Sequence, residues 1–191
     1  MKRSCLITST FLAAPLLAVA LGAPLSAETS CDATMMSASI AQLSATHATV
    51  NTSVLIDAAA ADVWATLTDF ENMASWSTGT LQTMTGDIKD GGNVVITFIF
   101  GVGENGQPNS NEIPHTLIYQ EGEKFGWSDP FPEDIGGGRD NHIYRVETCG
   151  YQTLFIQSDE VVDNPYATDF VAQLLPMYQI FNAELKAVVE N

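Results

Sequence analysis

The sequence predicts an α+β fold in which a seven-stranded antiparallel sheet curves around one long C-terminal helix. Several short segments alternate apolar with polar residues and are joined by turns, which is typical of antiparallel strands. The chain closes with a helical pattern that starts at Asn164-Pro165 and runs to about Val189. This helix is the only element large enough to cover the apolar face of such a sheet.

The first expected strand runs from Ala48 to Asp57, with Val50, Val54 and Ile56 on one side. Two short helices follow it, one at Ala58–Leu67 and a helical turn at Glu71–Trp76. Six further strands are expected at Leu81–Ile88, Asn93–Phe100, Glu112–Gln120, Lys124–Asp129, Asn141–Thr148 and Tyr151–Ser158. Polar, glycine-rich connections are expected at Gly101–Asn111 and Pro130–Arg139.

The N-terminal residues are expected to be a signal peptide, residues 1–27. Lys2 and Arg3 are followed by the apolar stretch Leu6–Leu21 and by small residues up to Ala27. The alternative, an uncleaved membrane anchor, needs about 20 apolar residues and is disfavoured by this shorter stretch. The sequence therefore predicts a periplasmic or secreted protein with a small-residue arm or short helix at 28–46 and one domain at 47–191.

The charge of the chain excludes several classes of partner. Seven basic residues stand against 23 acidic ones, a formal net charge of −16. Nucleic acid and anionic lipid surfaces need basic side chains to neutralise phosphates, so we expect neither nucleic-acid binding nor membrane insertion after signal cleavage. The same charge favours a soluble monomer or weak dimer.

Cys31 and Cys149 would remain after cleavage of the signal peptide. In an oxidising compartment they could form a disulfide between the N-terminal arm and the tip of a hairpin. Two separate thiols are the alternative. No Cys-x-x-Cys pair exists, which disfavours a redox or structural zinc site.

The order of elements and several local motifs resemble the SRPBCC superfamily of helix-grip proteins. That superfamily includes START-type lipid carriers, plant pathogenesis-related ten-class proteins and bacterial polyketide cyclase/dehydrase-like proteins. The matching motifs are Ile56-Asp57-Ala58, Val63-Trp64, Leu67-Thr68-Asp69-Phe70, Trp76, Gly86-Asp87-Ile88-Lys89-Asp90-Gly91, Phe125-Gly126-Trp127, His142-Ile143-Tyr144-Arg145-Val146 and Asn182-Ala183-Glu184-Leu185-Lys186. The resemblance implies a helix-grip domain with a ligand cavity under the C-terminal helix.

Candidate ligand contacts follow from the side of each strand that faces this cavity. His115 and Tyr119 share the more apolar side of one strand, and His142 and Tyr144 share a side of another. The other candidates are Trp127, Trp76, which could instead pack in the core or at the end of the sheet, and Leu174 and Tyr178 on the apolar face of the last helix. His115 and His142 are the candidate catalytic residues, as acid–base groups, and hydrogen-bonded pocket histidines are the alternative.

Other motifs do not support a cofactor or a metal. Gly101–Gly106 fits G-x-G-x-x-G, but a polar loop follows it where a dinucleotide site needs a helix. The acidic stretches Gly136–Asp140 and Ser158–Glu160 lack calcium-loop spacing and are expected to be solvated loops. Zinc would need a third ligand beside the two histidines. We therefore expect no cofactor and no metal.

Three hypotheses of function remain. The first is an exported binding protein that holds a hydrophobic or aromatic small molecule between sheet and helix. The second is a cyclase/dehydratase-type enzyme that uses histidine or tyrosine in the cavity as acid–base. The third is an interaction protein whose core is filled.

Overall fold

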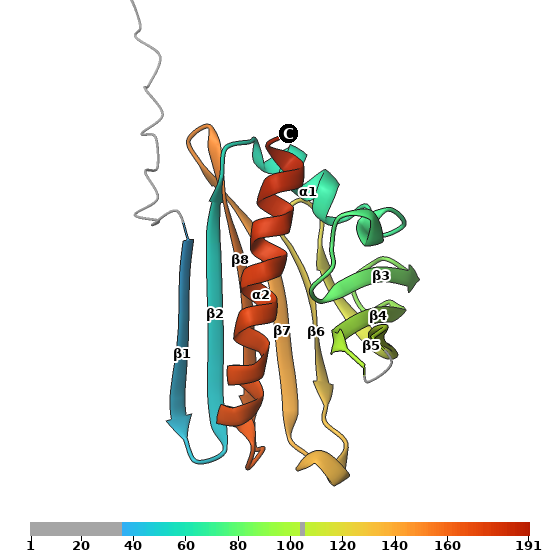
Figure 1. Cartoon of the computed structure of the whole chain (residues 1–191), viewed down its shortest axis with the longest axis vertical. Helices are drawn as coiled ribbons and strands as arrows, with labels where there is room; N and C mark the ends of the chain where they lie inside the picture. The colour runs from blue at the N-terminus through green and yellow to red at the C-terminus, as the bar shows by residue number, and fades with distance from the viewer. Residues whose placement is uncertain (1–35, 104–105) are drawn as a thin grey trace, which may run out of the picture.

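The computed structural model describes residues 36–103 and 106–191, which form an antiparallel sheet with a long helix along one face (Figure 1). The sheet order is β1-β2-β8-β7-β6-β5-β4-β3. The strands are β1 (Met36–Ser44), β2 (His47–Ile56), β3 (Leu81–Gly86), β4 (Asn93–Val102), β5 (Pro108–Gln120), β6 (Lys124–Pro130), β7 (Arg139–Cys149) and β8 (Gln152–Val162). The predicted α+β architecture is confirmed, with eight described strands instead of seven.

The extra strand is β1, where the sequence suggested an arm or a short helix. Residues 37–44 are exposed, so β1 carries no alternating apolar pattern that could have revealed it. It is instead held by backbone pairing with β2, in a register that places Ile40 opposite Val50. The described sheet therefore includes β1, which starts at Met36 within the segment predicted as an arm.

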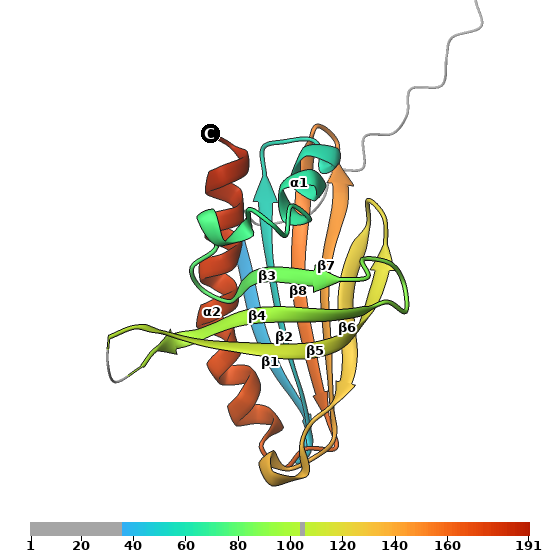
Figure 2. The same ribbon diagram turned by 90° about the vertical axis from the view of Figure 1, so that its right-hand side faces the viewer.

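The sheet bends sharply within β5. The first part of this strand, up to Thr116, pairs with β4, whereas Leu117–Gln120 pair with β6. As a result β3, β4 and β5 run across the direction of the other strands (Figure 2). The bend produces the concave face that the helix covers.

Two short helices follow β2, as predicted. They are α1 (Ala60–Leu67) and the 3₁₀ turn η1 (Met73–Ser75). Val63, Trp64 and Leu67 are buried because their helical spacing puts them on one face of α1. That face closes one end of the sheet, where the ring of Trp64 lies 6.2 Å from that of Phe125.

The C-terminal helix α2 (Ala167–Val189) packs on β2 and also contacts β8 and β1. Its start is set by Asn164, whose Oδ1 accepts a hydrogen bond from the Tyr166 backbone at 2.7 Å. The predicted apolar face is buried at Leu174, Tyr178, Phe181 and Leu185. Val188 was predicted on the same face but is 40% exposed, because it lies in the last turn.

The connections are shorter than predicted. Strands β4 and β5 extend into the expected loop Gly101–Asn111, leaving residues 103–107 between them. The irregular stretch before β7 contains the 3₁₀ turn η2 (Glu133–Ile135). This turn lies beside the start of α2, because the Asn164 side chain donates hydrogen bonds to the carbonyl groups of Ile135 and Gly137.

Cys149 ends β7, is buried and is disulfide-bonded. Its predicted partner Cys31 and the predicted signal peptide lie outside the described residues, so both remain predictions. Within the described residues, no helix is long and apolar enough to cross a membrane.

Candidate functional site

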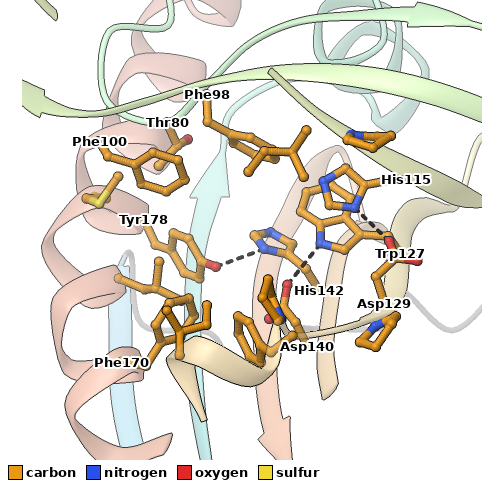
Figure 3. A pocket seen from close by; sticks show the side chains of 18 of the residues that line it. Thr80, Phe98, Phe100, His115, Trp127, Asp129, Asp140, His142, Phe170 and Tyr178 are labelled. Atoms are coloured by element: carbon orange, nitrogen blue, oxygen red, sulfur yellow. Dashed lines mark hydrogen bonds and ion pairs between the residues drawn. The ribbon is translucent and has the colours of Figure 1, made fainter. Parts of the chain in front are cut away.

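A cavity of about 490 Å³ lies between the N-terminal half of α2 and the bent part of the sheet (Figure 3). Its wall is mainly apolar and aromatic, with a few polar groups. The side chains come from β4 to β7, from α2, from the η2 connection and from the residue just before β3. They include Thr80, Phe98, Phe100, Ile113, His115, Trp127, Asp129, Phe131, Ile135, Asp140, His142, Tyr144, Phe170, Leu174, Met177 and Tyr178.

The cavity brings together six of the eight side chains predicted as ligand contacts: His115, Trp127, His142, Tyr144, Leu174 and Tyr178. Alternation along β5 and β7 placed both histidines on the correct side of the sheet. Their role in binding or catalysis remains a prediction.

The other two predicted contacts, Trp76 and Tyr119, do not line the cavity. The ring of Trp76 packs against Phe181, with 5.2 Å between ring centroids. Tyr119 lies on the predicted side of β5 but at the end covered by α1, and its hydroxyl donates to Glu121 at 2.6 Å. Partial burial, with this bond and the charge of Glu121, raises the pKa of Tyr119 to about 12. Alternation predicted the side of the strand but not the position along it.

Four rings form a continuous stack across β5, β6 and β7. The ring of Trp127 lies 4.6 Å from that of His115 and 4.5 Å from that of His142, and His142 lies 4.5 Å from Tyr144. Trp127 and His142 stack because they are directly opposite each other in the β6–β7 pair. The stack gives the cavity an aromatic wall.

His142 is held in one neutral form by two partners. The Gln157 amide nitrogen, which can only donate, lies 3.3 Å from Nε2, so that ring nitrogen is the acceptor. The proton is therefore on Nδ1, which donates to the Tyr178 hydroxyl at 2.8 Å. Burial lowers the pKa of His142 to about 4, because a charged imidazole would lose its hydration.

Tyr178 passes this hydrogen bond on to Asp159. Its hydroxyl donates to Asp159 Oδ2 at 2.7 Å, and Asp159 is only 2% exposed. The nearby Asp140, which lines the cavity, accepts a hydrogen bond from Trp127 Nε1 at 3.0 Å through its own Oδ2. In Figure 3 the side chain of Tyr178 points toward His142, and that of Trp127 toward Asp140.

The carboxyl groups of Asp140 and Asp159 lie close enough for each to influence the pKa of the other. Burial raises the pKa of both, and the charge of Asp159 raises that of Asp140 further. Burial and the same two carboxyl groups also raise the pKa of Tyr178, which therefore stays a neutral donor. The wall of the cavity thus contains a pair of acidic side chains whose protonated forms are favoured by burial.

Sequence reasoning missed this pair because both acids were assigned to solvated loops. They lie in strands: Asp140 in β7 and Asp159 in β8. A signal was present, since Asp159 continues the buried alternation of Phe155, Gln157 and Val161 along β8. The predicted strand ended at Ser158 and did not follow that alternation far enough.

His115 forms the second polar pair of the cavity. Its Nδ1 lies 2.6 Å from Asp129 Oδ2, and its side chain is 7% exposed. The other ring nitrogen, Nε2, is buried without a hydrogen-bond partner among the described residues, as are the hydroxyl groups of Thr80 and Tyr144. These polar atoms belong to residues that line the cavity, where a bound molecule could satisfy them.

The described residues contain no group of three or more His, Cys, Asp or Glu side chains placed to hold a metal ion. The side chains of the cavity can form hydrogen bonds, stack on aromatic rings and transfer protons through Tyr178, His142 and the carboxyl groups.

Residues 47–190 match the model of a family described as polyketide cyclase/dehydrase and lipid transport. No curated protein matches the sequence. Among solved structures, a protein from Rhodobacter sphaeroides is 17% identical, with a TM-score of 0.58 over 80% of this chain and 98% of that chain. The Zhui aromatase/cyclase from a Streptomyces species is 15% identical, with a TM-score of 0.54 over 75% and 94%.

The major latex-like protein 151 of Panax ginseng is 13% identical, with a TM-score of 0.57 over 76% of this chain and 99% of that chain. At these identities the structural likeness shows a shared fold, and the family model supplies the assignment. The chain belongs to the polyketide cyclase/dehydrase and lipid transport family, within the SRPBCC superfamily.

Proposed function

We propose that this protein is exported and binds a hydrophobic, ring-containing small molecule between the sheet and α2. The observation that carries the proposal is the cavity of about 490 Å³. Protein interiors rarely leave voids larger than a water molecule, and small-molecule sites typically measure about 300–1,000 Å³. The rings of His115, Trp127, His142 and Tyr144 give the cavity an aromatic wall against which an apolar ring can pack.

A cavity-filling substitution tests binding. N-phenyl-1-naphthylamine, a neutral probe whose fluorescence rises in apolar surroundings, should bind the wild type. Leu174→Trp places a large ring in the cavity and should weaken probe binding at least about tenfold, whereas Ala172→Trp on the exposed side of α2 should not. Absence of probe binding to the wild type, or equal binding by the two variants, would count against the proposal.

A cyclase/dehydratase-type activity is the second candidate, and His115 is the observation that favours it. Asp129 orients this ring, and the free Nε2 could take a proton from a bound carbonyl compound. Deuterium exchange at C1 of 2-tetralone, followed by NMR, tests this. The wild type should accelerate exchange and His115→Ala should not. If the two proteins exchange the probe at the same rate, His115 is not the base.

Export is supported by the order of basic, apolar and small residues in 1–27. N-terminal sequencing of the protein from the periplasm or medium of an expressing bacterium should begin at Glu28. A start at Met1 in the cytoplasmic fraction alone would contradict export.

A further inference from the structure

The described cavity wall carries carboxyl groups, and its basic side chains are histidines alone. Asp129 and Asp140 line it, Asp159 lies directly behind Asp140, and neither Lys nor Arg is among its described lining residues. His142, the most deeply buried imidazole of the wall, is neutral. A ligand carboxylate would therefore meet like charges and no counter-ion, whereas a cation would meet the opposite charge.

The hydrogen bonds of Asp140 and Asp159 indicate where the pair could hold a proton that a ligand displaces. Each carboxyl uses Oδ2 to accept a hydrogen bond, from Trp127 in one case and from Tyr178 in the other. In each of the two carboxyl groups, Oδ1 is buried and has no hydrogen-bond partner among the described residues. His142 on β7 is directly opposite Asp159 on β8. Asp140 lies two residues before His142 on the same face of β7, so it is the diagonal neighbour of Asp159. One proton shared between the two Oδ1 atoms would satisfy both.

Few other titratable groups surround Asp140 and Asp159. Asp129 is directly opposite Asp140 in the β6–β7 pair, and His115 is bonded to Asp129. The remaining titratable neighbours are His142 and Tyr144 on β7, Glu160 on β8 and Tyr178 on α2. Within this group, a cation that lies against Asp140 would favour the deprotonated form of the Asp140–Asp159 pair.

Aromatic faces complete the surroundings of a cation. Trp127 lies beside Asp140, and Phe131 and Phe170 meet edge to face at 4.9 Å on the same side of the cavity. Because His115 and His142 cover the two faces of Trp127, the rings left for a cation are those of Phe131 and Phe170, and ammonium groups bind favourably over aromatic faces when water is excluded. A carboxylate next to aromatic faces fits a molecule with one ammonium group and an apolar ring.

We propose that the cavity binds an organic cation, an amine with an aromatic ring, whose ammonium group lies against Asp140 and displaces the proton shared by Asp140 and Asp159. The ammonium group keeps its own protons, the displaced proton goes to solvent, and the carboxyl pair gains one negative charge that the ligand neutralises. This inference rests on the proposed small-molecule function and adds the class of ligand.

Three probes with one ring system test the charge preference: 2-naphthylmethylammonium, 2-naphthalenemethanol and 2-naphthoate. Titration calorimetry at pH 7 and low salt should show the amine binding about tenfold or more tightly than the alcohol, and the carboxylate most weakly. Repeating the amine titration in phosphate and in Tris, whose ionisation enthalpies differ, should show release of a proton on binding.

Asp140→Asn is the decisive variant. It should bring the amine and the alcohol within about threefold of each other while the alcohol still binds. Asp134→Asn removes the same charge from an exposed position in η2 and should leave the preference unchanged. If Asp140→Asn does not fold, the wild type alone decides, because its affinity for the amine should rise between pH 5.5 and 8 as the displaced proton becomes easier to lose.

The outcomes separate this inference from the proposed function. Equal or tighter binding of the alcohol, no proton release, or a preference that survives Asp140→Asn overturns the amine inference and leaves small-molecule binding intact. If none of the three probes binds, the amine inference also fails. Only the additional failure of N-phenyl-1-naphthylamine to bind would overturn the proposed function as well.

Discussion

Tyr178 on α2 donates a hydrogen bond to the buried carboxyl group of Asp159 on β8, with 2.7 Å between the two oxygen atoms. The same hydroxyl accepts a hydrogen bond from His142 on β7. One phenol therefore connects the long helix to two neighbouring strands at the wall of the cavity. Buried polar groups are costly to leave without partners. This bond therefore links the packing of α2 on the sheet to the protonation state of Asp140 and Asp159.

Tyr178→Phe should lower the free energy of unfolding by about 2–3 kcal/mol, because it leaves Asp159 Oδ2 and His142 Nδ1 without the hydroxyl. Urea denaturation followed by tryptophan fluorescence measures the loss. Tyr151→Phe is the matched control, since Tyr151 is 76% exposed, and it should change stability little. A Tyr178→Phe protein as stable as the control would contradict the role assigned to this hydroxyl.

The contacts of Tyr178 also show how far the sequence could predict the site. Helical spacing in the last helix placed Leu174 and Tyr178 on its buried face, and alternation in the strands placed His142 and Tyr144 opposite them. These patterns arise because the side chains that face the core or the cavity are apolar. The side of each element that lines the cavity was therefore predictable.

Features that do not depend on apolar burial were not predictable. The strand β1 has exposed side chains, so only its backbone bonds reveal it. Asp140 and Asp159 resemble solvated acids in sequence, and their burial depends on donors from Trp127 and Tyr178, which are distant in the chain. Tyr119 was wrongly assigned to the cavity. Its position under α1 depends on where the sheet bends within β5, which alternation along the strand does not show.

The neutral state of His142 predicts how stability responds to acid. An unfolded histidine takes up a proton near pH 6.5, whereas folded His142 does so only near pH 4. Between these values the unfolded state binds more protons, so this group destabilises the fold as the pH falls from about 6.5 to 4. A shift of about 2.5 pKa units corresponds to about 3 kcal/mol.

His142→Gln removes this response. Unfolding of the wild type and of the variant, measured from pH 7 to pH 4, isolates the contribution of His142 from that of the many carboxylates. The stability difference between the two proteins should shift by about 3 kcal/mol in favour of the variant over that range. A difference that stays constant with pH would mean that His142 does not titrate as its burial indicates.

Asp159 should have the opposite effect on the alkaline side. Its pKa is raised by burial, so the folded state keeps a proton that the unfolded chain has already lost. The stability supplied by this proton is complete below the ordinary aspartate pKa of about 3.9 and is lost as the pH rises through the folded-state value.

Asp159→Asn should therefore become progressively more stable relative to the wild type as the pH rises above about 3.9 and toward the raised pKa of folded Asp159. The asparagine still accepts from Tyr178 and can donate to Asp140, so the geometry of the network is retained. Asp134→Asn is the control for loss of one exposed charge. Parallel stability curves for Asp159→Asn and the wild type would show that the carboxyl does not carry the extra proton.

Gly126 sets the spacing of the aromatic wall, because its backbone lies against that of His142. A Cβ at this position would lie 1.9 Å from the carbonyl oxygen of His142, so Gly126→Ala must push β6 and β7 apart. The adjacent Trp127 would move with the strand and break its stack with His142. We expect a loss of at least about 3 kcal/mol in unfolding free energy, typical of severe overpacking.

Gly122→Ala separates this clash from backbone strain. Gly122 has φ +74° and no atom within 4 Å of its would-be Cβ, so alanine should cost only about 1–2 kcal/mol, the penalty of a left-handed residue. Urea denaturation compares the two variants, and binding of N-phenyl-1-naphthylamine reports the wall. Gly126→Ala should weaken the probe more than Gly122→Ala does. Equal effects would mean that the close approach of β6 and β7 does not shape the cavity.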